Sequence, residues 1–227
     1  DRARFVQVIL DEVARLDRIV TSLLQYARPR VPELRPARLE QCVARVVELS
    51  RDQTRGAGVV VEVDVAPRLA PVYIAPDLVQ QVLLNVTLNA VQAMPKGGTL
   101  RYEVRLARRR APERGPGRRS DDSGRPSRGG EARWIRTQQV RVIDTGVGIP
   151  RGVMQKLFDP FFTTRATGTG LGLSISQTIM QEHGGSIAVD SREGRGTTVL
   201  LNFPLEKRHG ERRQPAARAD RSHAADR

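Results

Sequence analysis

The stretch FFTTRATGTGLGLSIS, residues 161–176, decides the fold, because glycines at three alternate positions lead directly into an apolar segment of helical spacing. A helix is expected over residues 171–183, ending at the Gly184-Gly185 pair. The free backbone N–H groups and the positive dipole end of such a helix favour an anion. A glycine run alone also occurs in flexible loops and helix caps. The stretch therefore predicts an anion site whose identity depends on the rest of the sequence.

The segment Asp144-Thr-Gly-Val-Gly-Ile-Pro150 follows directly on a strand expected at residues 140–143. An acid at the end of a strand can accept a hydrogen bond from an exocyclic amine, and Gly146 and Gly148 let the backbone approach a flat ring closely. A tight turn without a ligand is the plainer interpretation of the same pattern.

Two amides, Asn85 and Asn89, lie four residues apart and therefore on one face of a helix expected over residues 77–94. Asp77 and Gln80 resemble a capping box at the start of this helix. An amide oxygen is a suitable neutral ligand for Mg²⁺. Satisfied residues at the rim of the core are the alternative for two asparagines alone.

The pattern as a whole predicts one α+β domain over residues 38–205. Helices and strands follow one another in mixed order, which indicates a layer of helices on a mixed sheet. The glycines at residues 194–198 fit a hairpin turn between the last two strands. Besides the elements above, a helix is expected at residues 38–54 and strands at residues 59–65, 100–106, 186–190 and 197–203.

Segments of different composition flank and interrupt this domain. Residues 1–28 carry apolar residues at heptad spacing, which predicts one long helix of a helical bundle, with an ordinary amphipathic helix as the alternative. The proline-containing residues 29–37 predict a stiff linker. An insertion at residues 107–135 and a tail at residues 206–227 are rich in Arg, Gly, Pro, Ser and Ala, and are predicted to be disordered.

The formal charge of +13 does not by itself predict a nucleic-acid-binding protein. Nine arginines stand against four acids in residues 107–133, and seven Lys or Arg against four acids in residues 206–227, with no aromatic residue for base stacking in either segment. No apolar run approaches the roughly 18 to 20 residues that cross a bilayer. A single cysteine, Cys42, excludes an internal disulfide and fits a reducing compartment.

In this order and at these separations, the motifs resemble the N, G1, F, G2 and G3 boxes of the ATP-binding domain of sensor histidine kinases, and FFTTRATGTGLGLSIS is highly specific to that family. The resemblance covers roughly residues 38–205. Residues 11–29, DEVARLDRIVTSLLQYARP, resemble the second helix of the dimerisation bundle that precedes this domain, particularly in the nitrogen-regulation-like branch. The resemblance implies a Bergerat-type two-layer sandwich of the GHKL superfamily, preceded by one long bundle helix.

The resemblance also implies a role for each matching residue. Asn89, assisted by Asn85, is expected to bind Mg²⁺, and Asp144 to bind the adenine of ATP. Residues 158–170 are expected to form a mobile lid from which Arg165 reaches the phosphates, so that Asn85, Asn89 and Arg165 form the catalytic group. The nucleotide contacts implied are Asp144, Gly146, Gly148, Phe158, Thr164, Arg165, Gly168, Thr169, Gly170, Leu171, Gly172 and Thr197.

The implied activity is that of a protein histidine kinase, which transfers the γ-phosphoryl group of Mg-ATP to a histidine and onward to a response regulator. The acceptor histidine is expected outside this chain, because His209 and His223 lie in the tail and His183 is expected at a helix C-terminus, where a cation suits the dipole. One alternative is a GHKL-type ATP hydrolase, which is disfavoured because Asn85 stands where those enzymes carry a water-activating Glu. The other is a non-catalytic ATP-binding scaffold.

The partners implied are a response-regulator receiver domain and, through the bundle helix, a second copy of the full-length protein. No nucleic acid is expected as a partner. The chain opens as a piece of something longer. A cytoplasmic location is expected, with membrane association only through missing N-terminal parts of the parent protein.

Overall fold

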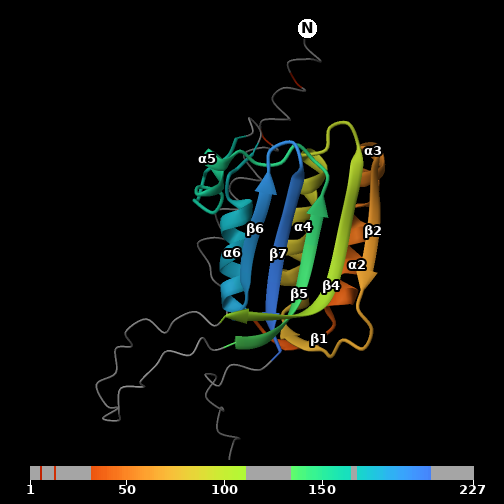
Figure 1. Cartoon of the computed structure of the whole chain (residues 1–227), viewed down its shortest axis with the longest axis vertical. Coiled ribbons are helices and arrows are strands. Elements are labelled where there is room, and N and C mark those ends of the chain that lie inside the picture. The colour runs from red at the N-terminus through yellow and green to blue at the C-terminus, as the bar shows by residue number, and fades with distance from the viewer. Residues whose placement is uncertain (1–5, 7–12, 14–31, 111–133, 165–167, 206–227) are drawn as a thin grey trace, which may run out of the picture.

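The computed structural model describes residues 6, 13, 32–110, 134–164 and 168–205. Five strands form one mixed sheet in the order β2-β4-β5-β7-β6, and helices α2, α4 and α6 lie on one of its faces (Figure 1). The predicted α+β architecture is therefore confirmed. The elements are β1 (Arg35–Ala37), α2 (Leu39–Leu49), α3 (Arg51–Gly56), β2 (Val59–Val65), β3 (Val72–Ile74), α4 (Pro76–Gln92), β4 (Gly98–Arg110), β5 (Trp134–Asp144), α5 (Arg151–Met154), α6 (Gly172–Glu182), β6 (Ser186–Arg192) and β7 (Gly196–Pro204).

The sheet is mixed because β2 pairs parallel to β4, whereas the other neighbours pair antiparallel. The longest pairing joins β4 to β5, from Leu100 opposite Asp144 to Arg110 opposite Trp134. The predicted disordered insertion at residues 107–135 is therefore too wide at both ends. Backbone pairing extends the ladder into residues whose arginine-rich composition does not predict a strand, because the ladder uses main-chain groups rather than side chains. Residues 111–133 lie outside the described residues.

Two further predictions about the N-terminal half of the domain were incomplete. The end of the predicted linker forms strand β1, which pairs antiparallel with the unpredicted strand β3. The helix expected at residues 38–54 is divided at Ser50 into α2 and α3. The Ser50 hydroxyl donates to the Val46 carbonyl oxygen at 2.8 Å, a bond of the kind that bends helices.

Helix α4 begins without the predicted capping box. Ala75 is its N-cap, Pro76 occupies the first turn, and no side chain caps the helix. Pro76 suits this position because it has no N–H group to satisfy and its φ is already helical. The Gln80 side chain instead hydrogen-bonds Cys42 of α2, so it is not available to the helix start.

The core lies between the helices and the inner face of the sheet. Leu39 of α2, Leu83 of α4, Tyr102 of β4 and Leu201 of β7 are fully buried there. A polar contact crosses this layer, between the hydroxyl oxygens of Thr87 and Tyr102 at 2.5 Å. Burial raises the pKa of Tyr102 to about 12, so its hydroxyl stays protonated.

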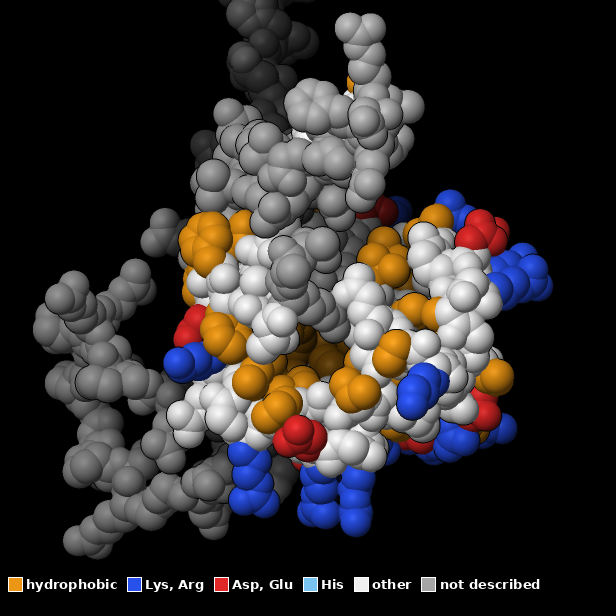
Figure 2. All heavy atoms as spheres, turned by 90° about the horizontal axis from the view of Figure 1, so that it is seen from above, with side chains coloured by type: hydrophobic (Ala, Val, Ile, Leu, Met, Phe, Trp, Pro, Cys, Tyr) orange, Lys and Arg blue, Asp and Glu red, His pale blue; other side chains and the backbone are white. Residues whose placement is uncertain are grey.

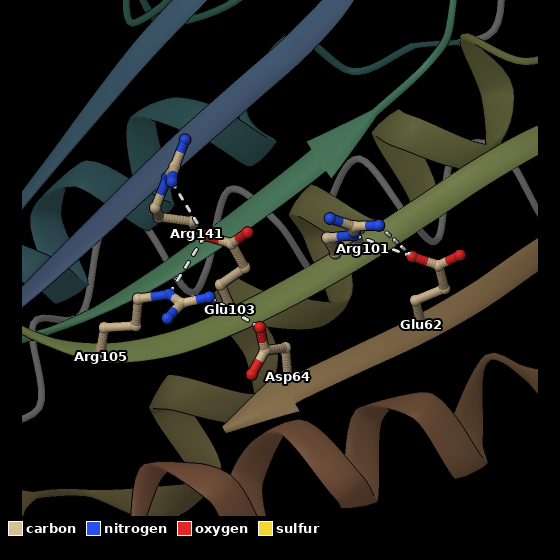
Figure 3. Close-up of polar contacts among 6 residues, drawn as sticks. All are labelled: Glu62, Asp64, Arg101, Glu103, Arg105 and Arg141. Carbon is tan, nitrogen blue, oxygen red and sulfur yellow. Dashed lines mark hydrogen bonds and ion pairs between the residues drawn. The ribbon is translucent and has the colours of Figure 1, made fainter. Parts of the chain in front are cut away.

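The outer face of the sheet carries cross-strand ion pairs (Figure 3), and no described helix covers it (Figure 1). Arg101 contacts Glu62 at 2.7 Å, and Arg105 contacts Asp64 at 2.6 Å. Glu103, whose side chain is only 10% exposed, accepts from Arg141 at 2.8 Å. These arginines are therefore partnered by acids of the same sheet.

Several predictions fall on residues that the structure does not describe. These are most of the bundle helix at residues 1–28, the first part of the linker and the tail at residues 206–227. Within the described part of the chain, no helix is long and apolar enough to span a membrane.

Candidate functional site

Asp144, the last residue of β5, lies at the centre of the candidate site. It faces Leu100 of β4 on one side and Thr197 of β7 on the other. Its Oδ1 accepts two backbone hydrogen bonds, from Gly146 N at 2.9 Å and from Thr197 N at 3.2 Å. Both bonds end on the same oxygen, so among the described residues Oδ2 is the oxygen left for a further donor. Burial raises the pKa of Asp144, and the two backbone bonds oppose that rise.

The glycine loop after β5 is held between the end of α4 and the β6–β7 hairpin. Val147 N donates to the Ala93 carbonyl oxygen at 3.0 Å, and Gly194 N donates to the Val147 carbonyl oxygen at 2.7 Å. A Cβ on Gly146 would lie 2.6 Å from the Ala93 oxygen. The sequence predicted that the missing side chain of Gly146 makes room for a flat ligand. In the structure, it also makes room for the Ala93 carbonyl group at the end of α4.

Asn85 and Asn89 lie on α4, which packs against α6. The Asn85 amide nitrogen donates to Ser176 Oγ at 3.0 Å, and Ser176 Oγ donates to the Gly172 carbonyl oxygen at 2.8 Å. A Cβ on Gly172 would overlap the Asn85 side chain. The predicted metal-binding helix face and the glycine-rich start of α6 are therefore in direct contact.

The predicted lid begins with Phe158, which is half-buried, and reaches the exposed Thr164. Phe161 is 62% exposed and has a positive φ of 66°. Gly170, with φ of 69°, lies against the Phe161 backbone, where no Cβ would fit. The last residue of the predicted lid therefore lies against the backbone of its fourth residue.

Arg165 lies outside the described residues, so its predicted contact with phosphate stays a prediction. Gly168 and Thr169 are half-buried, and Leu171 is buried beneath the start of α6. Seen from above, the end of the molecule at which β5 ends is hollowed near its middle, with hydrophobic side chains visible in the hollow (Figure 2).

Two features of the described residues fit an adenine nucleotide. A buried carboxylate has one oxygen occupied by backbone donors and the other left for an amine. Gly146 and Gly196 allow the surrounding backbone to approach this carboxylate, since a Cβ at either position would overlap Asp144 or its neighbours. Among the described residues no three His, Cys, Asp or Glu side chains gather as a metal site. The amide oxygens of Asn85 and Asn89 stay the protein ligands for Mg²⁺ that the sequence predicts.

His183 is a neutral structural residue, contrary to the cation expected at a helix C-terminus. Its Nε2 accepts from Ala75 N at 2.9 Å, which requires an unprotonated nitrogen, and Nδ1 lies 2.7 Å from the Ile179 carbonyl oxygen, to which it donates. Burial lowers the pKa of His183. The placement at the end of α6 was predicted, but the favourable charge–dipole interaction was wrong because the ring is buried.

A second concave region lies near the start of α4, away from Asp144. This cavity of about 300 Å³ is lined by Arg35, Arg38, Cys42 and Gln80 among others. Burial raises the pKa of Cys42 to about 11, so this thiol is a poor nucleophile at neutral pH. None of the predicted nucleotide contacts lines this cavity.

Two serines of the site were missed from the sequence. Ser176 is one helical turn after Gly172, and Ser191 lies opposite Thr197 in the β6–β7 hairpin. The sequence held a clue to each serine. Ser176 follows Gly172 by four residues and so lies on the same helix face, and a three-residue hairpin loop would have placed Ser191 opposite Thr197.

The sequence profile described as "Histidine kinase-, DNA gyrase B-, and HSP90-like ATPase" matches residues 74–207. The sensory histidine kinase/phosphatase NtrB of Rhodobacter capsulatus is 33% identical over 202 residues, which cover 87% of this chain and 51% of that protein. The chain spans about a quarter to half of the length of such curated relatives.

Solved histidine kinase structures have the same fold. The catalytic domain of histidine kinase ThkA superposes with a TM-score of 0.58 at 26% identity, covering 76% of this chain and 98% of that domain. ThkA in complex with the response regulator TrrA gives a TM-score of 0.64 at 25% identity, covering 89% of this chain and 51% of that one. The chain therefore belongs to the histidine kinase-, DNA gyrase B- and HSP90-like ATPase family, and these relatives within it are histidine kinases.

Proposed function

We propose that this chain is the ATP-binding catalytic domain of a two-component histidine kinase, which binds Mg-ATP and transfers the γ-phosphoryl group to a histidine outside the chain. The observation that carries the proposal is the arrangement at Asp144. Its carboxylate is oriented by two backbone N–H groups at the end of a strand, beside the helix that carries Asn85 and Asn89. In an ATPase of this family, such a carboxylate supports binding of the base, and the neighbouring asparagines support binding of the metal ion.

Each part of the site has a separate task. Asp144 Oδ2 would accept from the adenine amine, and the amide oxygens of Asn89 and Asn85 would hold Mg²⁺, which would neutralise phosphate charge. The backbone N–H groups at the start of α6 and Arg165 neutralise phosphate charge. Mg-ATP, when bound, supplies the reactive phosphoryl group, and the protein contributes mainly positioning and electrostatics.

Phosphotransfer to a residue outside this chain is supported by the state of His183. Both of its ring nitrogens are occupied by backbone partners, and the ring is 6% exposed. Transfer forms a P–N bond to an acceptor imidazole while the bond between the γ-phosphorus and the bridging oxygen breaks, so that ADP leaves and the imidazole loses its proton. An imidazole buried in this way cannot meet the γ-phosphate.

Hydrolysis is disfavoured by the chemistry of Asn85. An amide cannot take a proton from water, and this amide already donates to Ser176. Transfer onward to an aspartate of a response-regulator receiver domain is the corresponding proposal for the partner, and ThkA, a structural neighbour, was solved in complex with a response regulator.

The remaining organisation is proposed from the sequence. Residues 1–28 are one helix of a dimerisation bundle of the nitrogen-regulation-like branch, and residues 29–37 link it to the catalytic domain at residues 38–205. The parent protein works as a homodimer in the cytoplasm, without a nucleic-acid partner, and reaches the membrane only through other parts. Analytical ultracentrifugation of the full-length protein with and without this helix tests the dimer.

The first experiment measures ATP binding with and without Mg²⁺. Asn89→Ala is expected to weaken the binding of Mg-ATP far more than the binding of metal-free ATP, because it removes a metal ligand and no adenine contact. Asn202 lies on β7 and donates to Ser186. Asn202→Ala is therefore the control, and it is expected to keep the affinities for Mg-ATP and for metal-free ATP. Equal losses for Asn89→Ala with and without Mg²⁺ contradict the metal assignment.

The second experiment tests transfer. The chain is incubated with γ-labelled ATP, alone and with a separately folded bundle segment that bears an acceptor histidine. Label that is acid-labile and base-stable is expected only on the added segment. Label on His183 of the lone chain contradicts the structural role of that residue, and an unlabelled, well-folded acceptor favours the non-catalytic scaffold.

A further inference from the structure

Ser191 lies within one continuous row of inner-face residues at the candidate base site. It faces Thr197 across the β6–β7 pairing, and Thr197 faces Asp144 across the β7–β5 pairing. Directly opposed residues in antiparallel strands have Cβ atoms about 4.5 to 5.5 Å apart. Ser191 on β6 is therefore separated from Asp144 on β5 by one strand, and Thr197 of β7 lies between the two residues.

The Ser191 hydroxyl has three polar neighbours. It accepts from Ile149 N of the glycine loop at 2.9 Å and donates to the Gly196 carbonyl oxygen at 2.9 Å. Its third neighbour is Thr197 Oγ1 at 3.0 Å. A serine hydroxyl has one proton, and the Gly196 carbonyl can only accept it. The proton shared between the two hydroxyls must therefore come from Thr197.

This direction of donation fixes the chemistry that Thr197 offers to a ligand. Once its proton points at Ser191, the Thr197 hydroxyl can only accept. The neighbouring Asp144 carboxylate also only accepts, and its Oδ1 is already occupied by Thr197 N and Gly146 N. The site thus presents two acceptors side by side.

We propose that Ser191 is a positioning residue that sets base specificity, because it holds the Thr197 hydroxyl as an acceptor and so selects purines with a 6-amino group over those with a 6-keto group. The inference rests on the proposed function, in which the base lies at Asp144. An amino group offers two N–H donors to the two acceptors. A keto oxygen offers none and is repelled by both.

Binding of ATP and of inosine triphosphate provides the test. Inosine triphosphate carries a 6-keto group and an N1–H where ATP has a 6-amino group and an unprotonated N1, so each variant is judged by how it changes the ratio of the two affinities. Ser191→Ala frees the Thr197 proton, so Thr197 can turn and donate to a keto oxygen. The preference for ATP over the inosine nucleotide is expected to fall about tenfold, the equivalent of roughly one buried hydrogen bond. Ser191→Thr retains a hydroxyl and is expected to restore the preference.

The ratio separates positioning from a general structural role. Ser191→Ala also removes the hydrogen bond from Ile149 N. A looser glycine loop would weaken the binding of both nucleotides equally, which leaves the ratio of their affinities unchanged. Ser186→Ala, on the same strand but bonded to Asn202 at 3.3 Å, is the matched control and keeps both affinities and the ratio. Thr197→Val removes the acceptor itself, so adding Ser191→Ala to it is expected to change the ratio no further.

The outcomes distinguish this inference from the proposed function. If the wild-type chain binds neither nucleotide, the proposed function fails. If it prefers ATP and Ser191→Ala keeps the full preference, only the role of Ser191 is overturned. Should Ser191→Ala fail to fold, Ser191→Cys, with its weak S–H donor and weak sulfur acceptor, is expected to give a reduced preference, and an unchanged one overturns the role equally.

Discussion

Gly172 at the start of α6 lies against the carboxamide of Asn85 on α4, so closely that any side chain at residue 172 would overlap it. The same carboxamide donates to Ser176 one turn further along α6. The proposed metal-binding face of α4 and the proposed phosphate-binding start of α6 are therefore in contact through this pair. A displacement at either residue is transmitted to the other.

Gly172→Ala is accordingly expected to displace the Asn85 side chain and impair phosphotransfer by up to about a hundredfold, the cost of a misplacement near 1 Å. Transfer rate from Mg-ATP to an added acceptor segment measures this. Gly152→Ala is the control, because a Cβ at Gly152 meets open space. If both variants transfer at the wild-type rate, the contact has no role in positioning.

Asp144 is expected to lower the stability of the nucleotide-free fold at neutral pH. Since burial raises its folded pKa above the ordinary 3.8, the folded chain holds this proton more tightly than the unfolded chain. Stability from this group is greatest at low pH and is lost as pH rises through the raised pKa. Asp144→Asn, whose amide oxygen still accepts from Gly146 and Thr197, should be more stable than wild type at pH 7 and should lose adenine selectivity.

Urea unfolding of the wild type and Asp144→Asn between pH 4 and pH 7 checks the sign, because the difference must shrink as pH falls. Asp190→Asn, an exposed aspartate of β6, serves as the control. An Asp144→Asn protein less stable than wild type at pH 7 contradicts the cost assigned to burial.

His183 is expected to make the fold acid-sensitive near pH 6. Its folded pKa is lowered, so an unfolded chain binds a proton near the ordinary 6.5 while the folded chain resists it. Stability from the neutral ring is fully present above pH 6.5 and falls as pH drops below that value. His183→Gln keeps an acceptor for Ala75 N without titrating, so the slope of unfolding free energy between pH 7 and pH 5 should flatten. Equal slopes in the two proteins would rule this out.

Tyr102→Phe is expected to lower the unfolding free energy by about 1 kcal/mol, the usual value of one intramolecular hydrogen bond. Thr87 donates to the Leu83 carbonyl oxygen at 2.7 Å, so Tyr102 is the donor in the Thr87–Tyr102 pair. Tyr102→Ala should lower it by about 3 to 5 kcal/mol, because it leaves a cavity between α4 and β4. Chemical denaturation measures both values. The nucleotide affinity of the folded Tyr102→Phe protein should be unchanged.

The sequence predicted the elements with strong periodicity and missed those fixed by tertiary pairing. Strand β2 was predicted with its observed bounds, because five of the seven residues of Val59–Val65 are β-branched valines. Strand β3 has only three residues and exists through its pairing with β1, which no local pattern signals. The ends of β4 and β5 were missed for the same reason.

At the site, short-range spacing placed Asn85 and Asn89 on one helix and Asp144 at a strand end. The contacts that orient these groups come from residues distant in sequence. Asn85 and Ser176 are 91 residues apart, and Asp144 and Thr197 are 53 apart. Only the assembled sheet and helices bring them together.

The long β4–β5 hairpin separates the two ends of the domain. Asp144 lies opposite Leu100 at one end, and Trp134 lies opposite Arg110 at the other, where residues 111–133 join the strands. At about 3.4 Å per residue, roughly 30 Å of strand lies between them. A fluorescent reporter domain spliced into residues 111–133 would thus be attached at the end of these strands opposite to Asp144. This hairpin gives the protein engineer an attachment point for an optical sensor that leaves the Asp144 end of the strands unchanged.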